Sequence, residues 1–132
     1  MMKKMLVVED DVLSRDVLDR IFKSEYQIDY CFSGETFRQF IADNVYDVII
    51  MDIALQGKEN GLDLTRELKS DPVHSKTPIV CLTALAFKRD KEAAMRAGVD
   101  TFIVKPVANN VLRERVAEMV KEGLRKGEVE KG

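Results

Sequence analysis

The sequence Val48-Ile49-Ile50-Met51-Asp52 places four large apolar residues in a row and ends them with a carboxylate. The run is too short for a helix, and no polar residue alternates with the apolar ones. It therefore predicts a strand that is covered on both faces, as the strands of a parallel sheet are. Runs of the same kind occur at residues 5–8, 79–82 and 102–104, so we expect four such strands.

Residues 27–32 differ from these runs because apolar and polar side chains alternate along them. Ile28, Tyr30 and Phe32 share one side, with polar residues between them. This alternation is typical of a half-buried strand, and we expect that strand at an edge of the sheet.

Apolar residues at helical spacing separate the five runs and follow the last one, and they predict five helices. In chain order these residues are Leu13, Val17, Leu18, Ile21 and Phe22; Phe37, Phe40 and Ile41; Leu64 and Leu68; Ala93, Ala94 and Ala97; and Leu112, Val116, Met119 and Val120. Gly34 is placed to open the second helix, and Gly98 to end the fourth. Five strand–helix units predict an α/β fold, with a doubly wound five-stranded parallel sheet and helices on both faces.

The composition indicates a folded domain with no general affinity for polyanions. A chain of 132 residues, 45% hydrophobic and 33% charged, is long enough to bury a proper core. Its net charge of −2 gives no general attraction to DNA or to an anionic membrane, and no apolar run approaches a membrane span. Cys31 and Cys81 lie inside apolar runs, which favours two free, buried thiols in the cytoplasm.

The five strand–helix units account for residues 1–125. Residues 126–132 are charged, contain two glycines and show no apolar period. We expect them to form a frayed, charged C-terminal tail that is too short for an effector domain.

The residues that end the apolar runs carry polar groups. They are Glu9, Asp10 and Asp11 after the first, Asp52 after residues 48–51, Thr83 after residues 79–82 and Lys105 after residues 102–104. In an open α/β sheet the functional crevice lies beyond these carboxyl ends of the strands. We therefore expect these side chains to form the functional site.

The acids of this set need a cation. Two carboxylates ~4 Å apart repel each other by about 4 kcal/mol at an effective dielectric constant of about 20. Mg²⁺ prefers such oxygens, while Lys105 and Thr83 suit the oxygens of a phosphoryl group. The set predicts Mg²⁺-dependent phosphoryl transfer to a carboxylate nucleophile.

Four short motifs carry a resemblance to a known family. They are Leu6-Val7-Val8-Glu9-Asp10-Asp11, Val48-Ile49-Ile50-Met51-Asp52, Leu82-Thr83-Ala84 and Val104-Lys105-Pro106. Together, at the ends of successive strands, they make the chain similar to the receiver domain of bacterial two-component response regulators. The resemblance covers essentially the whole chain up to residue 125, and it implies a flavodoxin-like sheet with strand order 2-1-3-4-5.

The resemblance also implies a role for each residue of the site. Asp52 would accept the phosphoryl group, and Thr83 and Lys105 would bind the phosphoryl oxygens. Mg²⁺ would be held by Glu9, Asp10, Asp52 and the backbone carbonyl of Ala54. Phe102, three residues before Lys105, matches the aromatic position that switches together with Thr83.

For the chain as a whole, the resemblance implies a single-domain response regulator in a two-component phosphorelay. A sensor histidine kinase or a histidine phosphotransfer protein would phosphorylate Asp52. The chain would be no enzyme beyond its own Mg²⁺-dependent phosphorylation and slow dephosphorylation. It would act as a monomer that contacts a downstream protein through its fourth helix, fifth strand and fifth helix, without binding DNA or a membrane.

Several positions depart from the family pattern. Glu9 stands where Asp is commoner and reaches one methylene further, and Phe102 lacks the hydroxyl of the commoner tyrosine. Gln56 stands where proline is frequent, and the loop after Asp52 is one residue longer than usual. The carbonyl of Ala54 is the metal ligand that these last two changes affect most.

Two other classes of function fit the sequence less well. A phosphatase of the haloacid-dehalogenase type also uses an Asp nucleophile on an α/β sheet, but it needs a second acid two residues later, where this chain has Ala54. A binding module that works without phosphorylation is disfavoured by the complete set of acids, Thr83 and Lys105.

Two local assignments complete the interpretation. The metal pair within residues 9–11 could shift by one position, and we take Glu9 and Asp10 because Asp11 is placed to cap the first helix through Ser14. His74 has no acidic or cysteine partner at metal-ligand spacing, and we expect it to lie exposed in a loop.

Overall fold

The computed structural model describes residues 2–55 and 60–131, with residues 125–131 described by their backbone alone. Strands and helices alternate along the chain as predicted. They are β1 (Lys3–Val8), α1 (Val12–Phe22), β2 (Tyr26–Cys31), α2 (Gly34–Asp43), β3 (Val48–Met51), α3 (Gly61–Ser70), β4 (Ile79–Thr83), α4 (Lys88–Ala97), β5 (Thr101–Val104) and α5 (Asn109–Lys131).

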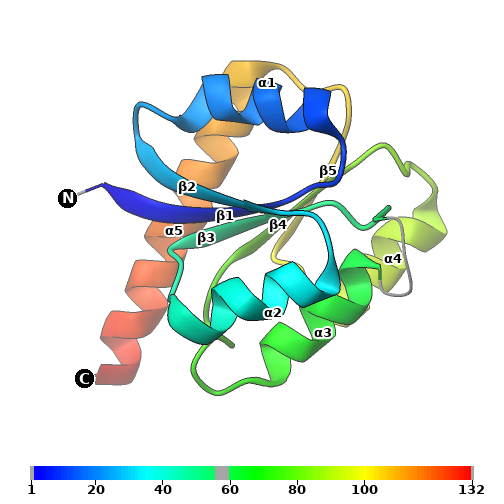
Figure 1. Cartoon of the computed structure of the whole chain (residues 1–132). Coiled ribbons are helices and arrows are strands. Elements are labelled where there is room, and N and C mark those ends of the chain that lie inside the picture. The colour runs from blue at the N-terminus through cyan, green and yellow to red at the C-terminus, as the bar shows by residue number, and fades with distance from the viewer. Residues whose placement is uncertain (1, 56–59, 132) are drawn as a thin grey trace.

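The strands form one sheet in the order β2-β1-β3-β4-β5, and every neighbouring pair is parallel. In Figure 1, α1 and α5 lie on one face of this sheet, and α2, α3 and α4 lie on the other. The predicted doubly wound sheet and its strand order are confirmed. The alternating strand, β2, stands at an edge, as its pattern predicted.

The apolar runs are buried because each strand contributes to two cores. Ile49 and Met51 belong to the cluster beneath α2, α3 and α4. Val48 and Ile50, which alternate with them, belong to the cluster beneath α1 and α5. All four side chains of β3 are at most 2% exposed. A run without polar alternation is what a strand with two covered faces requires.

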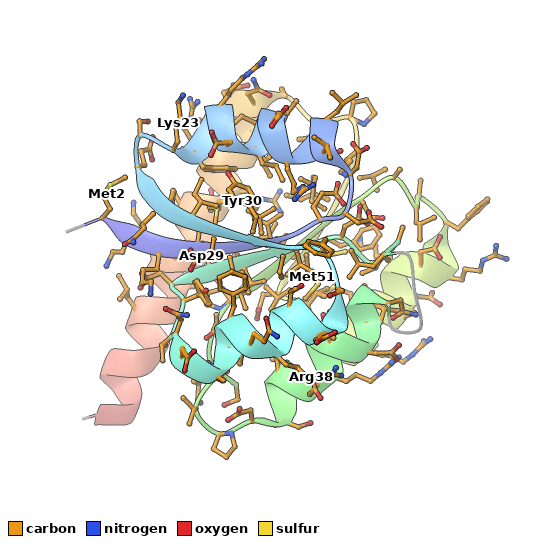
Figure 2. The ribbon with its side chains drawn as sticks, viewed as in Figure 1. Met2, Lys23, Asp29, Tyr30, Arg38 and Met51 are labelled. Carbon is orange, nitrogen blue, oxygen red and sulfur yellow. The ribbon has the colours of Figure 1, made fainter. Side chains whose placement is uncertain are left out.

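The edge strand β2 is only half covered. Asp29 and Tyr30 point to opposite sides of the sheet in Figure 2, and the Tyr30 hydroxyl donates to Asp19 of α1. The prediction that Phe32 is buried with Ile28 and Tyr30 is wrong, because β2 ends at Cys31 and Phe32 is 52% exposed. Phe32 lies outside the strand, beside the cap of α2.

Helix α1 buries a narrower stripe than its sequence predicted. Leu18, Ile21 and Phe22 pack against the sheet, whereas Leu13 and Val17 are 74% and 49% exposed. The predicted helix is confirmed, but these two members of its apolar period do not belong to the core. They lie on the outer border of the stripe and line a hollow that Pro106 also lines.

The helix ends follow their capping residues. The Asp11 carboxylate accepts hydrogen bonds from the backbone and hydroxyl of Ser14, at 2.9 and 2.8 Å, and so caps α1 as predicted. Gly34 opens α2 behind a capping box made by Ser33. Gly98 ends α4 with a φ of 110°, a left-handed conformation that glycine adopts without strain.

Two expectations about the surface need correction. His74 is only 5% exposed, and in the turn that follows α3 it lines a hollow that Phe37 of α2 and Leu68 of α3 also line. Residues 126–131, expected to be frayed, continue α5 as a helix up to Lys131.

The cysteines agree with their prediction. Cys31 and Cys81 are free and buried, and burial raises the pKa of each thiol to about 12. In the part of the chain that the structure describes, no helix is long and apolar enough to cross a membrane.

Gly61 lets the start of α3 approach the end of β3. A Cβ atom at this position would overlap the carbonyl oxygen of Asp52 and lie 2.8 Å from the Cα atom of Ile53. Both neighbours are backbone atoms that cannot move aside without moving the strand end. The absence of a side chain at Gly61 thus allows the local backbone position of Asp52.

We predict that Gly61→Ala lowers the free energy of unfolding by about 1–3 kcal/mol, as overpacking against a fixed backbone does. Urea unfolding of the two chains under identical conditions measures this difference. An unchanged midpoint of urea unfolding would show that the backbone at the end of β3 can move to accommodate the added methyl group without a loss of stability.

Candidate functional site

The hydrogen-bond ladder of the sheet continues past the strands and fixes the main chain of three site residues. The bonds run from Glu9 N to Cys31 O at 3.0 Å, from Asp52 N to Val8 O at 3.0 Å, and from Lys105 N to Thr83 O at 2.8 Å. The carboxyl ends of β1, β3 and β5 therefore bring these residues to one edge of the sheet, as the sequence predicted from their positions.

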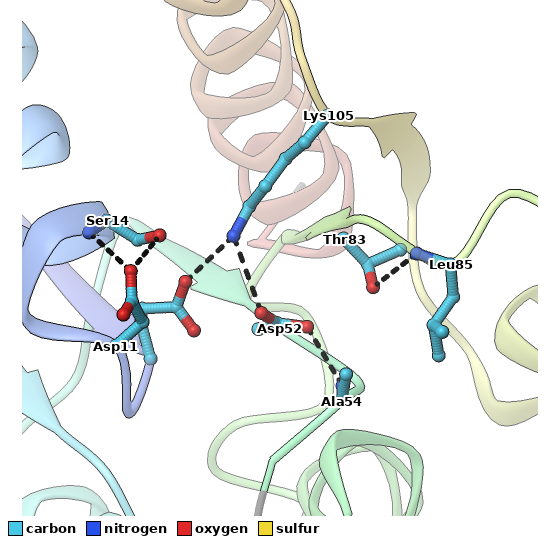
Figure 3. Close-up of polar contacts among 8 residues, drawn as sticks. Asp11, Ser14, Asp52, Ala54, Thr83, Leu85 and Lys105 are labelled. Carbon is cyan, nitrogen blue, oxygen red and sulfur yellow. Dashed lines mark hydrogen bonds and ion pairs between the residues drawn. The ribbon is translucent and has the colours of Figure 1, made fainter.

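Lys105 lies between two of the predicted acids. Its Nζ is 2.8 Å from Glu9 Oε1 and 3.5 Å from Asp52 Oδ2. Figure 3 shows the Lys105 side chain extending toward Asp52, with dashed lines to both carboxylates. The ammonium thus neutralises part of the repulsion between the two carboxylates.

Glu9 is the more deeply buried of the two acids. Its side chain is 3% exposed, compared with 12% for Asp52. Burial raises the pKa of Glu9 above its ordinary value, and the hydrogen bond from Lys105 opposes this rise without cancelling it. Burial acts to lower the pKa of Lys105, but Glu9 and Asp52 together outweigh it and raise that pKa.

Asp52 is oriented by its own loop. Its Oδ1 atom accepts a hydrogen bond of 2.8 Å from the backbone N–H of Ala54, while Oδ2 faces Lys105. The carboxylate is therefore held at both oxygens, by a neutral donor and by a cation. Both donors reduce the charge that its oxygens present to an incoming anion.

Thr83 makes a local contact. Its side chain is fully buried, and its Oγ1 atom accepts a hydrogen bond of 3.2 Å from the backbone N–H of Leu85. Ala84, which lies between them in the sequence, is exposed and has only a methyl group as its side chain. The hydroxyl is thus tied to the loop after β4, and the role predicted for it toward a phosphoryl group stays a prediction.

The other residues predicted for the site do not contact Lys105 or Asp52 in the hydrogen bonds and ion pairs described above. Phe102 is partly buried against the core beneath α2, α3 and α4, so its switch role stays a prediction. Asp11 is committed to Ser14, whose hydrogen bonds lower the pKa of that carboxyl group. Asp10 is half-buried beside Glu9. Gln56 lies outside the described residues.

The predicted metal ligands do not form a cage in this structure. Among the described residues, no three His, Cys, Asp or Glu side chains come together as they would around a metal ion. Two features nevertheless fit a cation. Glu9 Oε2 is buried without a hydrogen-bond partner among these residues, and an ammonium already bridges Glu9 and Asp52. The ligand set of Glu9, Asp10, Asp52 and the Ala54 carbonyl stays a prediction.

Sequence reasoning missed two contacts of this site. It paired Lys105 with a phosphoryl group and not with Glu9, and it assigned the carbonyl of Ala54 without noticing its N–H. The longer side chain of Glu9 was the available signal for the first contact. For the second, a turn that places an N–H two residues after a carboxylate is common, but nothing in the sequence selects it.

The fold and the site together define an α/β domain with an acidic site and a lysine at the carboxyl ends of its parallel strands. A family model described as the response regulator receiver domain matches residues 5–117, and the chain belongs to this family. Receiver domains take a phosphoryl group from histidine kinases and are phospho-acceptor switches, not metabolic enzymes.

Known proteins agree with this membership. The regulatory protein VanRB of Enterococcus faecalis is 30% identical over 117 residues, which cover 89% of this chain and 51% of VanRB. The chain spans about half the length of the first curated relatives that it matches. The crystal structure of a Chloroflexus aurantiacus protein described as a response regulator is 28% identical, with a TM-score of 0.86, covering 92% of this chain and 99% of that one.

A second solved structure bears on the metal. It is the receiver domain of a sensor histidine kinase from Pseudomonas aeruginosa, with a magnesium ion coordinated in its active-site cleft. It is 25% identical, with a TM-score of 0.83, and the match covers 92% of this chain and 99% of that one. Magnesium binding is therefore a property found within the family.

We predict that the stability of the metal-free chain depends on the protonation of Glu9. Because its pKa is raised in the folded chain, the folded state binds this proton more tightly than the unfolded state does. The free energy of unfolding, taken relative to that of Glu9→Gln, should rise as the pH falls from neutral through the raised pKa of Glu9 toward the ordinary pKa of a glutamate. Urea unfolding with a chelator present measures it.

Glu92→Gln is the matched control for this measurement, because Glu92 is 52% exposed on α4. Its difference from the unchanged chain should not follow the same trend. A relative stability of the Glu9→Gln chain that is flat across this pH range would contradict the assignment.

Proposed function

We propose that this chain is a phosphorylation-controlled switch in which Asp52 accepts a phosphoryl group. The donor would be a phosphohistidine of a sensor histidine kinase or of a histidine phosphotransfer protein. The observation that carries the proposal is the placement of Asp52 at the end of β3, with one oxygen held by the Ala54 N–H and the other facing Lys105. Membership of the receiver family supports it.

In the proposed reaction, an Asp52 oxygen attacks phosphorus and forms the new O–P bond. The P–N bond to the donor imidazole breaks, and its electron pair stays on the imidazole nitrogen. Lys105 offsets charge on the phosphoryl oxygens, and the Thr83 hydroxyl binds one of them. Mg²⁺ held by Glu9, Asp10, Asp52 and the Ala54 carbonyl would neutralise further charge on these oxygens.

Thr83 would carry the signal out of the site. Its Oγ1 atom now bonds the N–H of Leu85, and a move toward a phosphoryl oxygen would release that N–H. The same move would leave space for Phe102 to turn inward. Because Phe102 has no hydroxyl, burial of its ring would favour the inward state.

The output would pass through the surface formed by α4, β5 and α5. Large apolar side chains are exposed on these elements and on the loop before α4: Leu85, Phe87, Met95, Val104 and Val111. Lys91 and Arg96 are exposed on α4 beside them. Apolar patches with a charged rim are typical of protein-binding surfaces, so we propose a downstream protein as the target and a monomer as the working form.

Other parts of the sequence interpretation stay predictions. These are the stand-alone role, the boundary of the receiver domain at residue 125, the absence of DNA binding and the cytoplasmic location.

We predict that the chain gains the mass of one phosphoryl group when it is incubated with acetyl phosphate and Mg²⁺, and that Asp52→Asn abolishes this gain. The amide keeps the shape of the side chain but is not a nucleophile of the required kind. Intact-mass spectrometry measures the gain, and circular dichroism establishes that the variant is folded.

Two controls sharpen this experiment. A chelator should prevent the gain, and Asp10→Asn should weaken Mg²⁺ binding, so that the gain needs a higher Mg²⁺ concentration while Asp52 is still present. If Asp52→Asn is labelled at the unchanged rate, the acceptor is another residue, and Asp10 is the next candidate.

For the output surface, we predict that Lys91→Glu with Arg96→Glu weakens binding of the downstream partner about tenfold or more while Asp52 is phosphorylated at the unchanged rate. Like charges on a rim disfavour a partner more than they alter a distant site. Calorimetry with the identified partner and intact-mass kinetics make the two measurements. If the variant is instead phosphorylated more slowly, the protein that donates the phosphoryl group binds at the surface formed by α4, β5 and α5.

A further inference from the structure

A hollow of about 450 Å³ lies between α2 and α3, which Figure 1 shows side by side on one face of the sheet. Phe37 of α2 and Leu68 of α3 are buried and line its floor, together with His74 from the turn that follows α3. Val73 stands at its mouth and is 66% exposed. The hollow is therefore apolar inside and open to water, and none of the residues that line it belongs to the acidic site.

The apolar surface continues past Val73. This side chain also lines a second, smaller hollow, which Val45 and Leu124 line as well. The three side chains are between 47% and 66% exposed, and none of them is among the apolar residues of the output surface proposed above. Large exposed apolar side chains around a concave apolar floor are typical of a protein-binding surface.

The charge at the hollow between α2 and α3 is acidic. Arg38 of α2 reaches across to α3, where its Nε donates to both carboxylate oxygens of Glu67 at 3.1 and 3.0 Å, so these two charges offset each other. Asp71 has a different partner, because its Oδ1 accepts the backbone N–H of Val73 at 2.9 Å. A neutral donor leaves the carboxylate its negative charge. A cation carried by a bound partner would meet this charge at the mouth of the hollow.

The end of α3 adds to this negative potential. Asp71 is the C-cap of α3, at the end of the helix where the carbonyl groups attract cations. Lys69, the basic residue of the last turn, is committed elsewhere: its Nζ donates to Asp100 at 3.0 Å and to the carbonyl of Thr77 at 2.9 Å. The helix end thus favours a cation that a partner supplies.

His74 is the polar residue of the floor. Its Nδ1 atom is buried and has no hydrogen-bond partner among the described residues. A buried nitrogen without a partner raises the free energy of the folded chain, so packing alone would favour an apolar side chain at this position. A bound side chain with an apolar ring and one O–H or N–H group, such as Tyr or Trp, would fill the hollow and offer a donor to a ring nitrogen of His74.

We propose that the hollow between α2 and α3 is a second protein-binding surface. Its occupant is a helix of a partner protein that inserts one Tyr or Trp into the hollow and carries a Lys or Arg one turn away, beside Asp71. A third helix is the element that fits a groove between two helices. Tyr, Trp and Arg are also the side chains that most often dominate the binding energy of an interface. The proposal goes beyond the function proposed above and does not depend on Asp52.

A blocked, alanine-rich helical peptide of about 16 residues tests the proposal, with one Trp at its centre and a Lys four residues before and after it. The chain contains no tryptophan, so the fluorescence anisotropy of the peptide's Trp reports the peptide alone. We expect a saturable rise of the anisotropy with the full chain, and nuclear magnetic resonance should show shifts at the amides of Phe37, Leu68 and His74. No binding, or shifts confined to the acidic site or to the output surface, would overturn the proposal.

A double-mutant cycle tests the placement of the cation. Replacing both lysines of the peptide by glutamine should weaken its binding to the unchanged chain about threefold, the scale of one partly exposed ion pair. The same replacement should have little effect on binding to Asp71→Asn. Glu114→Gln, which removes an exposed carboxylate of α5, is the matched control and should keep the full dependence on the peptide's lysines. A dependence as strong in Asp71→Asn as in the unchanged chain would overturn the proposal.

Two further variants separate binding from folding. His74→Leu removes the unpaired nitrogen, so we expect it to melt at or above the temperature of the unchanged chain and yet to bind the peptide more weakly. Val73→Lys places a cation at the exposed mouth and should weaken binding about tenfold or more, whereas Val111→Lys, at a position of α5 that is 46% exposed, should not. Unchanged binding in Val73→Lys, or in a folded His74→Leu chain, would overturn the proposal.

Other occupants of the hollow give different results. If the full chain self-associates in sedimentation and Val73→Lys prevents it, the occupant is a second copy of the chain and the proposal is overturned. If tryptamine, which has the ring and the cation without the helix, binds as tightly as the peptide, the occupant is a small molecule and the proposal is overturned as well. A monomer that binds the peptide more tightly than tryptamine supports the partner helix, whichever residue the intact-mass experiment identifies as the phosphoryl acceptor.

Discussion

Burial of the central strands on both faces is the constraint on which the rest of this structure depends. Met5, Val7, Leu6 and Val8 of β1 divide between the two cores, as the four residues of β3 do. Each large apolar side chain buried in this way contributes about 1.5–3 kcal/mol relative to exposure. No charged group can replace one of them without a partner, so the polar residues of these strands are confined to their ends.

This confinement explains why the site stands where it does. Glu9 and Asp52 are the residues at which β1 and β3 emerge from the core, and their amides still follow the ladder of the sheet. The sheet therefore fixes the main chain of both acids at one edge, and both side chains reach the same lysine. The stability of the folded sheet offsets the electrostatic repulsion between the carboxylates of Glu9 and Asp52. Lys105, which contacts both, reduces that repulsion.

The sequence was sufficient to predict the strands and the edge of the sheet that carries the site. It was not sufficient to predict which apolar side chains of a helix are buried or which side chains pair with each other. Strand positions and the site edge follow from apolar runs and from the residues that end them, whereas the strand order followed from the family resemblance. Leu13 and Val17 share the helical period of Leu18, so periodicity could not show that the sheet covers only one part of that stripe. The partner of Lys105 depends on the length of Glu9 and on a packed geometry that pattern alone does not contain.

The short bonds around Lys105 also connect the acidic site to the surface. The Lys105 N–H donates to the carbonyl of Thr83, and the N–H of Leu85, in the exposed loop before α4, donates to the Thr83 hydroxyl. A phosphoryl group on Asp52 would offer oxygens to Lys105 and to Thr83 alike, so it would compete with both the Glu9 pair and the Leu85 bond. Each contact that it replaces is one hydrogen bond, with a net contribution of about 0.5–1.5 kcal/mol for a neutral pair and about 1.5–3 kcal/mol for a charged one. Contacts of this size are weak enough for one phosphoryl group to exchange, while the buried strands beneath them stay fixed.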